Sequence, residues 1–275
     1  MPVLSHVTPV LCLLLCLSGL AQASPLAKSA LEASPVDDIV AQYPAMMSEG
    51  VRRGLSQSGM NDPMVVTTVA AVVRNAFRAA DMQSGLISDL SSAMTDQQLE
   101  AVRDWYGTPL AGKISQAEIE ASGPGTWQKI ENGASDFQAR FKGSERAALF
   151  SRYDQAARAT ESAVDTTVAV QLGLATAISA FQGSGESGFE KLKQGIESQR
   201  QQTRAMVAQQ VYDMYLYTYR DLSVDELKDY IGFLETGAGA TFTRVVTASI
   251  QDSITRPVEA VGRQLARFLG PSEAE

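Results

Sequence analysis

Cysteine and histidine are nearly absent from this sequence, and the few present lie at its N-terminal end. The two cysteines are Cys12 and Cys16, and the single histidine is His6. From residue 24 onward the chain therefore offers no thiolate, no imidazole base and no Cys/His zinc ligand. This excludes cysteine nucleophiles, the Ser-His-Asp triad and the common zinc sites from that part of the protein. We expect no metal and no cofactor.

The first residues have the pattern of an export signal. An apolar run over 10–20 precedes Ala21-Gln22-Ala23, a small-x-small sequence typical of signal-peptide cleavage. The run is well short of the ~20 residues that a membrane-spanning helix needs. We expect residues 1–23 to be removed and the protein to be periplasmic or secreted. Retention of this segment as an anchor is the alternative.

Clusters of positive charge are also lacking. The chain has a formal charge of −8 and no dense run of lysine and arginine. Nucleic-acid binding depends mainly on neutralising phosphates, so we expect no nucleic-acid partner. The most apolar stretch after the leader, 168–181, is too short to cross a bilayer and is interrupted by polar residues. We therefore expect no stable membrane insertion once the leader is removed.

Strand signals are almost missing, whereas helical patterns are frequent. No Asn-Gly or Asp-Gly turn joins two runs of alternating β-branched residues. Apolar residues instead recur at three- and four-residue spacing, as in Val246, Ile250, Ile254 and Val258. The sequence predicts an all-α bundle of roughly nine to eleven helices, with the clearest glycine-rich loop at 183–188.

A degenerate repeat relates two segments at an offset of 128 residues. Residues 94–108 align with residues 222–236, and the matches combine polar helix-start residues with apolar positions at helical spacing. The matched pairs are Thr95 with Ser223, Gln98 with Glu226, Leu99 with Leu227, Trp105 with Phe233, Tyr106 with Leu234, and Thr108 with Thr236. We interpret the repeat as a pair of duplicated helical units.

Each copy predicts a short capped helix, a sharp corner and a longer helix. Thr95 and Ser223 are each followed three residues later by a side chain that completes a capping box. Thr108 precedes a proline and Thr236 precedes glycine, so each threonine is expected to cap the next helix. The first copy extends over 94–122 and the second over 222–250.

The predicted organisation has four parts. Residues 24–122 form an N-terminal helical unit that holds the first copy, and 144–275 form a C-terminal unit that holds the second. Residues 123–143 are expected to connect the units, and 1–23 form the signal peptide. The apolar faces of the two units are expected to pack together.

The repeated pattern of Ser/Thr-x-x-Glu-Leu, then Phe-Tyr, then Ser/Thr-Pro-x-Gly resembles the bacterial exported domain-of-unknown-function family two-zero-five-nine. The second copy keeps Ser223, Glu226, Leu227, Phe233, Thr236 and Gly239, and the first keeps Thr95, Leu99, Tyr106, Thr108 and Pro109. Departures are Trp105, Ala111, Leu234 and Gly237, and the likeness covers less than half of the chain. The resemblance implies a helical exported domain and supplies no activity.

Aromatic residues provide the candidate binding positions. In the segment 211–220, Tyr212, Tyr215 and Tyr219 share one helical face, where tyrosine rings could stack on a sugar or grip a partner. The competing interpretation is that this helix is packed between others. Trp105 and Tyr106 in the first repeat copy are the other candidates.

Three functions fit these observations. The leading expectation is a non-enzymatic binding or interaction protein whose partner is another envelope protein. The alternatives are a carboxylate-dependent enzyme acting on cell-wall glycan and a binder of lipophilic small molecules. Glu186-Ser187 is similar to the Glu-Ser of lytic transglycosylases, but it lies in the predicted glycine-rich loop, where a catalytic acid would be poorly positioned.

Structural features would distinguish these three functions. A glycan enzyme predicts two carboxylates roughly 5–10 Å apart in an open cleft. A lipophilic binder predicts a closed apolar cavity of about 300 Å³ or more between the two units. An interaction protein predicts an exposed apolar patch of several hundred Å².

Overall fold

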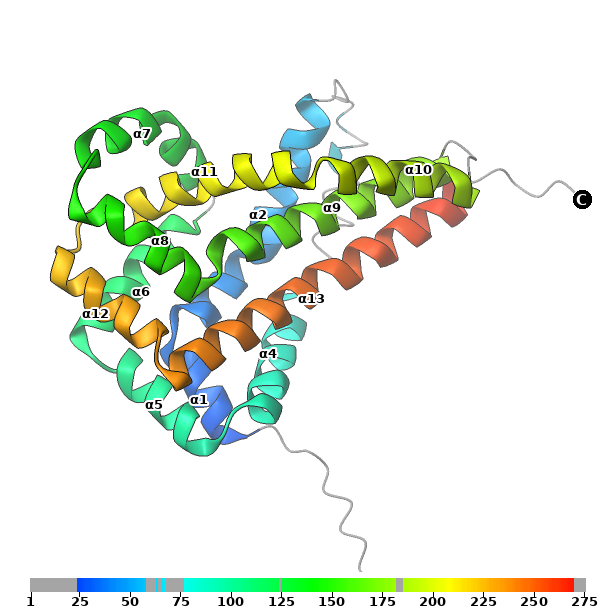
Figure 1. The fold of residues 1–275 in the computed structure, drawn as a ribbon. Coiled ribbons are helices and arrows are strands. Elements are labelled where there is room, and N and C mark those ends of the chain that lie inside the picture. The colour runs from blue at the N-terminus through cyan, green and yellow to red at the C-terminus, as the bar shows by residue number, and fades with distance from the viewer. Residues whose placement is uncertain are drawn as a thin grey trace, which may run out of the picture.

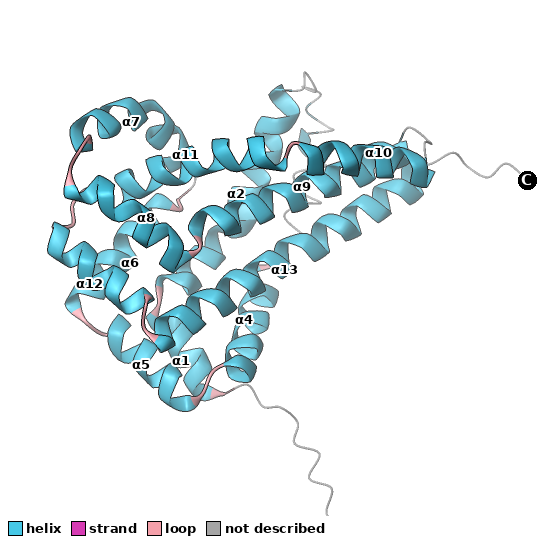
Figure 2. Ribbon diagram, in the orientation of Figure 1, coloured by secondary structure: helices cyan, strands magenta, loops and turns pink. Residues whose placement is uncertain are grey.

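The computed structural model describes residues 24–57, 63, 66–67, 77–123, 125–181 and 185–269, and this part of the chain is helical throughout, with no strand. The all-α class is therefore confirmed (Figure 2). The signal-peptide prediction for residues 1–23 lies outside the described residues. The helices are α1 (Pro25–Ala33), α2 (Pro35–Gln57), α4 (Ala79–Ala93), α5 (Asp96–Tyr106), α6 (Pro109–Ala121), α7 (Thr126–Phe141), α8 (Glu145–Ala157), α9 (Ala159–Phe181), α10 (Gly185–Ser198), α11 (Arg200–Thr218), α12 (Val224–Leu234) and α13 (Gly237–Leu269).

Both predicted capping boxes are present. The Thr95 hydroxyl accepts a hydrogen bond from the Gln98 amide at the start of α5, and the Gln98 side chain accepts from the Thr95 amide. Ser223 and Glu226 repeat this arrangement at the start of α12. Each box satisfies backbone N–H groups that the first turn of a helix leaves free.

The predicted corners are also confirmed. The Thr108 hydroxyl accepts from the Ala111 amide, which begins α6 directly after α5. The Thr236 hydroxyl accepts from the Gly239 amide at 3.0 Å, which begins α13 directly after α12. These local hydrogen bonds explain why each repeat copy is a helix, a corner and a second helix.

The long helices run side by side, and the short ones gather at one end of them. α13 packs along α9 and also contacts α4, while α9 contacts α10 and α11. The short helices α5, α6, α7, α8 and α12 lie at the end opposite α10 (Figure 1). This end contains both repeat corners and the C-terminal end of α11, and it builds the candidate site.

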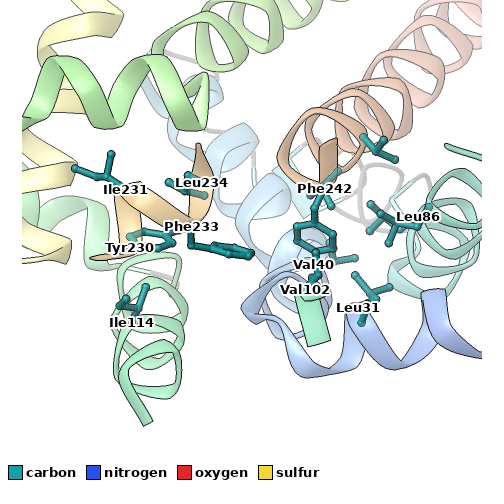
Figure 3. Close-up of a cluster of buried hydrophobic side chains, with 14 of the residues drawn as sticks. Leu31, Val40, Leu86, Val102, Ile114, Tyr230, Ile231, Phe233, Leu234 and Phe242 are labelled. Carbon is teal, nitrogen blue, oxygen red and sulfur yellow. The ribbon is translucent and has the colours of Figure 1, made fainter. Parts of the chain in front are cut away.

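One main core joins the two predicted units. Its buried residues include Leu31, Leu86 and Leu99 from the N-terminal unit and Leu216 and Leu227 from the C-terminal unit. Figure 3 shows the part of this cluster where α12 and α13 meet α1, α2, α4 and α6. The interface between the units is therefore part of the protein's interior.

Most of 123–143, the predicted connector, is α7. α10 begins at Gly185, inside the segment 183–188 that was predicted to be a glycine-rich loop. The side chain of Glu186 lies outside the described residues. Among the helices that the structure describes, none is both long and apolar enough to cross a membrane.

Candidate functional site

A pocket of about 330 Å³ lies where helices of both predicted units meet. α2 and α6 contribute Ile39 and Glu118, α7 contributes Trp127, and α8, α9 and α11 form the remaining wall. The lining is mainly apolar and aromatic, and Trp127, which is 38% exposed, also faces solvent. The volume falls within the range of ~300–1,000 Å³ that is typical of small-molecule sites.

The sequence of α6 turns a carboxylate toward the inside of the protein. Ala111, Ile114 and Ala121 are its buried residues, and Glu118 lies on the same helical face at the same three- and four-residue spacing. α6 packs against α2, α7 and α11 through this side. An acidic residue thus occupies a position that helical periodicity assigns to the core.

Tyrosine hydroxyls surround the Glu118 carboxyl group. The hydroxyls of Tyr219 and Tyr230 both donate to Glu118 Oε1, each at 2.6 Å. The hydroxyls of Tyr153 and Tyr219 are 3.1 Å apart. Since the one Tyr219 proton is donated to Glu118, Tyr153 is the donor in that second hydrogen bond. Residues from α6, α8, α12 and the end of α11 are thereby joined in one polar network.

Burial changes the proton affinity of every member of this network. Burial raises the pKa of Glu118, and the hydrogen bonds from Tyr219 and Tyr230 oppose that rise. Burial and the neighbouring Glu118 charge hold the pKa values of Tyr219 and Tyr230 well above the usual tyrosine value. The same two causes raise the pKa of Tyr153. The tyrosines therefore remain neutral hydrogen-bond donors near neutral pH.

A buried arginine holds the end of α11 in place. The Arg146 guanidinium donates to the carbonyl oxygens of Tyr219 and Leu222, which follow the last turn of α11. The Tyr215 hydroxyl in turn donates to the Arg146 carbonyl at 2.8 Å. Burial lowers the pKa of Arg146. These bonds fix the backbone of Tyr219 and so orient its hydroxyl toward Glu118.

The three tyrosines predicted on one face of 211–220 occupy different environments. Tyr215 and Tyr219 are each 2% exposed, and both line the pocket. Tyr212 is partly buried, with its ring 4.9 Å from that of Phe150. The helix is packed between others, and Tyr215 and Tyr219 present only a small part of their surface to the pocket.

Trp105 and Tyr106 lie outside the pocket, in the core between the repeat copies. The Trp105 ring stacks on that of Phe233, with centroids 4.6 Å apart and an interplanar angle of 8°. Tyr106 meets Phe233 edge-on and also packs near Phe242. Trp105 Nε1 is buried without a hydrogen-bond partner among the described residues. The structure therefore gives these two residues a packing role.

Glu118, Tyr153 and Tyr230 were not among the site residues predicted from the sequence. A signal for Glu118 was present, because a charged residue in the apolar spacing of an amphipathic helix marks a buried charge or a polar site. Tyr153 and Tyr230 carried no such signal. They approach Glu118 because α11 contacts both α6 and α8, and α8 contacts α12. Figure 3 shows Tyr230 of α12 and Ile114 of α6 as members of the same core cluster.

Two other kinds of site were considered. In the described part of the chain, no group of three or more His, Cys, Asp or Glu residues is placed to hold a metal ion. A second depression of about 490 Å³ lies between α8 and the start of α13 and includes Arg152, Arg158 and Arg244. These arginines are exposed, and Arg152 is paired with Glu235. The pocket around Glu118 is therefore the better-built site.

Comparisons with protein families, with curated proteins and with solved structures found no match to this chain. Function is consequently inferred from the pocket.

Proposed function

We propose that this protein is non-enzymatic and binds a small, largely apolar molecule in the pocket between its two helical units. The observation that supports this function is a 330 Å³ space with apolar and aromatic walls and one polar network at Glu118. Binding sites for small molecules commonly combine an apolar lining with a few convergent polar groups that orient the ligand. Of the three functions expected from the sequence, the lipophilic binder fits this geometry best.

The other two functions have less support from the described residues. Glu118 is the only carboxylate among the described residues that line the pocket, whereas glycan hydrolysis generally needs two facing carboxylates. The large apolar side chains that are exposed, Trp127, Leu192 and Met206, come from three different helices. Single exposed apolar residues are ordinary on protein surfaces and do not define a docking patch.

Trp127 allows binding to be measured directly. The chain has two tryptophans, and Trp105 lies in the core away from the pocket. In a Trp105→Phe protein, fluorescence therefore reports from Trp127 alone. We expect titration with the neutral apolar probe N-phenyl-naphthylamine to quench this signal saturably, since the probe enters beside Trp127.

A variant that fills the pocket tests where the probe binds. Ala163 on α9 lines the pocket, and Ala163→Phe is expected to weaken probe binding by at least about tenfold, equivalent to ~1.4 kcal/mol. Ala101→Phe on the exposed face of α5 is the matched control and should bind normally. Equal binding by both variants, or no saturable binding to the parent protein, would contradict the proposed function.

We further propose that binding takes place after export and that the two units arose by duplication within a family resembling two-zero-five-nine. The export proposal is supported by the apolar run and the Ala21-Gln22-Ala23 sequence. N-terminal sequencing of the protein recovered from its own cells tests it, because a mature chain should begin at Ser24. The duplication proposal is supported by the matching capping boxes and corners.

A further inference from the structure

The Glu118 carboxyl group has no positive partner in its surroundings. Among the described residues that line the pocket it is the only charged one. Its pKa responds to burial and to two tyrosine hydrogen bonds, and no lysine or arginine contributes. The nearest α6 carboxylate, Glu120, differs in this respect because Arg220 Nη2 lies 3.1 Å from it. Glu118 is partly buried, and charges withdrawn from water are usually paired, so its lack of a cationic partner calls for a physical reason.

Glu118 directs one of its two oxygens at the tyrosines. Both tyrosine hydroxyls donate to Oε1, each at 2.6 Å, and donors of this kind favour the ionised form of a carboxyl group. Both donors bind the same oxygen, and Oε2 accepts no hydrogen bond from the described residues. The carboxylate thus has a second oxygen available to a ligand.

The neighbouring wall of the pocket is aromatic. The rings of Tyr153, Tyr215 and Tyr219 line it and pack on one another, with centroid separations of 5.1 to 5.5 Å. Because Tyr215 and Tyr219 are each only 2% exposed, a ligand meets mainly the Tyr153 ring. Trp127 lines it as well. Aromatic faces attract cations through the negative potential above the ring, and several together form the cages that recognise ammonium groups. A carboxylate beside such rings offers a cation both a counter-charge and a favourable surface.

We propose that the ligand carries a cationic ammonium group, which binds between Glu118 Oε2 and the Tyr153 ring, with its apolar part directed toward the α9 and α11 wall. This inference depends on the proposed function, because it names the chemistry of the molecule in the same pocket. An ammonium group supplies the positive charge that the described residues do not. An anionic ligand, such as a fatty acid, would instead face an uncompensated carboxylate.

Three probes of equal chain length separate these cases. Octylammonium, octanol and octanoate are titrated near neutral pH into the Trp105→Phe protein, with Trp127 fluorescence as the signal. We expect octylammonium to bind at least about tenfold more tightly than octanol, and octanoate to bind most weakly. Glu118→Gln should remove the preference for octylammonium over octanol, since glutamine can still accept both tyrosine hydrogen bonds but carries no charge.

The control variant is Glu100→Gln, which makes the same charge change at an exposed position on α5 and should keep the preference. Thermal unfolding of both variants establishes that they are folded. If octanol or octanoate binds as tightly as octylammonium, or if Glu118→Gln keeps the preference, the inference is wrong while small-molecule binding stands. If none of the three probes nor N-phenyl-naphthylamine binds, the proposed function itself fails.

Discussion

The corner between α5 and α6 and the corner between α12 and α13 use the same hydrogen bonds to make different interiors. Each begins with a capping box and turns at a threonine that caps the next helix. At the 128-residue offset, however, Glu118 of the first copy matches Val246 of the second, and Tyr230 of the second matches Val102 of the first. Glu118 and Tyr230 are hydrogen-bonded, whereas Val102 and Val246 are apolar members of the main core.

The difference shows how a repeated scaffold can hold a site in one place only. The caps and corners are local, so both copies keep them. The polar pair of Glu118 and Tyr230 is present only once. At the related positions, Val246 and Val102 stabilise the core without adding a polar group. The pocket is found beside the polar pair and not beside the apolar one.

The largest expected loss of stability comes from the corner between α12 and α13, where the backbones of the two helices approach each other closely. A Cβ atom added at Gly239 would lie 2.1 Å from the Phe233 carbonyl oxygen, and the matching residue of the first copy is Ala111. We expect Gly239→Ala to lower the free energy of unfolding by about 3 kcal/mol because backbone atoms must move apart. Urea unfolding monitored by circular dichroism measures this loss.

Ala111→Gly is the matched change at the first corner and should cost only about 1 kcal/mol, through added backbone entropy in the unfolded chain. Similar losses of unfolding free energy for Gly239→Ala and Ala111→Gly would show that the helices approach equally closely at both corners. The two corners would then not differ in this respect.

The next largest loss of stability is expected when the hydrogen bond between Tyr230 and Glu118 is removed. Tyr230→Phe removes one of the two donors to Glu118 Oε1 and leaves the ring in place. We expect a loss of about 2 kcal/mol in unfolding free energy, since hydrogen bonds to buried charged groups are stronger than neutral ones. Differential scanning calorimetry near neutral pH would detect it as a lower melting temperature.

The control for this variant is Tyr217→Phe. Tyr217 donates at 3.2 Å to Glu120, which is exposed and also paired with Arg220. Its removal should cost about 0.5 kcal/mol, because water can replace the lost bond. A Tyr230→Phe protein no less stable than Tyr217→Phe would mean that the Glu118 network contributes little to folding.

The smallest effect measures how strongly the two copies are coupled. Trp105 and Phe233 occupy matching repeat positions and stack on each other at 4.6 Å. A double-mutant cycle with Trp105→Leu and Phe233→Leu should give a coupling energy of about 1 kcal/mol, typical of an aromatic pair beyond its burial. Additive losses would show that the copies meet only through general apolar contact. Trp105→Leu with Leu192→Ala, a change on distant α10, is the uncoupled reference.

The helical fold, its capping boxes and its corners were predictable because the residues that cause each of them lie close together in the sequence. Thr95 and Gln98 are three residues apart, as are Ser223 and Glu226, and a capping box needs nothing else. The segment 123–143, predicted only as a connector, contains the helix α7, in which Gly133 and Ser135 are tolerated because the helix packs against α6 and α11.

The sequence by itself determined the all-α class, both capping boxes, both corners and the absence of cysteine and histidine chemistry after residue 23, because these follow from composition and short-range spacing. The sequence marked only Glu118, through its place in the apolar spacing of α6, and tertiary structure decided the rest of the site. Glu118 lies 101 residues before Tyr219 and 112 before Tyr230, and Tyr153 comes from yet another helix. Only the contacts of α11 with α6 and α8, and of α8 with α12, bring these hydroxyls to one carboxylate, and no local pattern encodes that meeting.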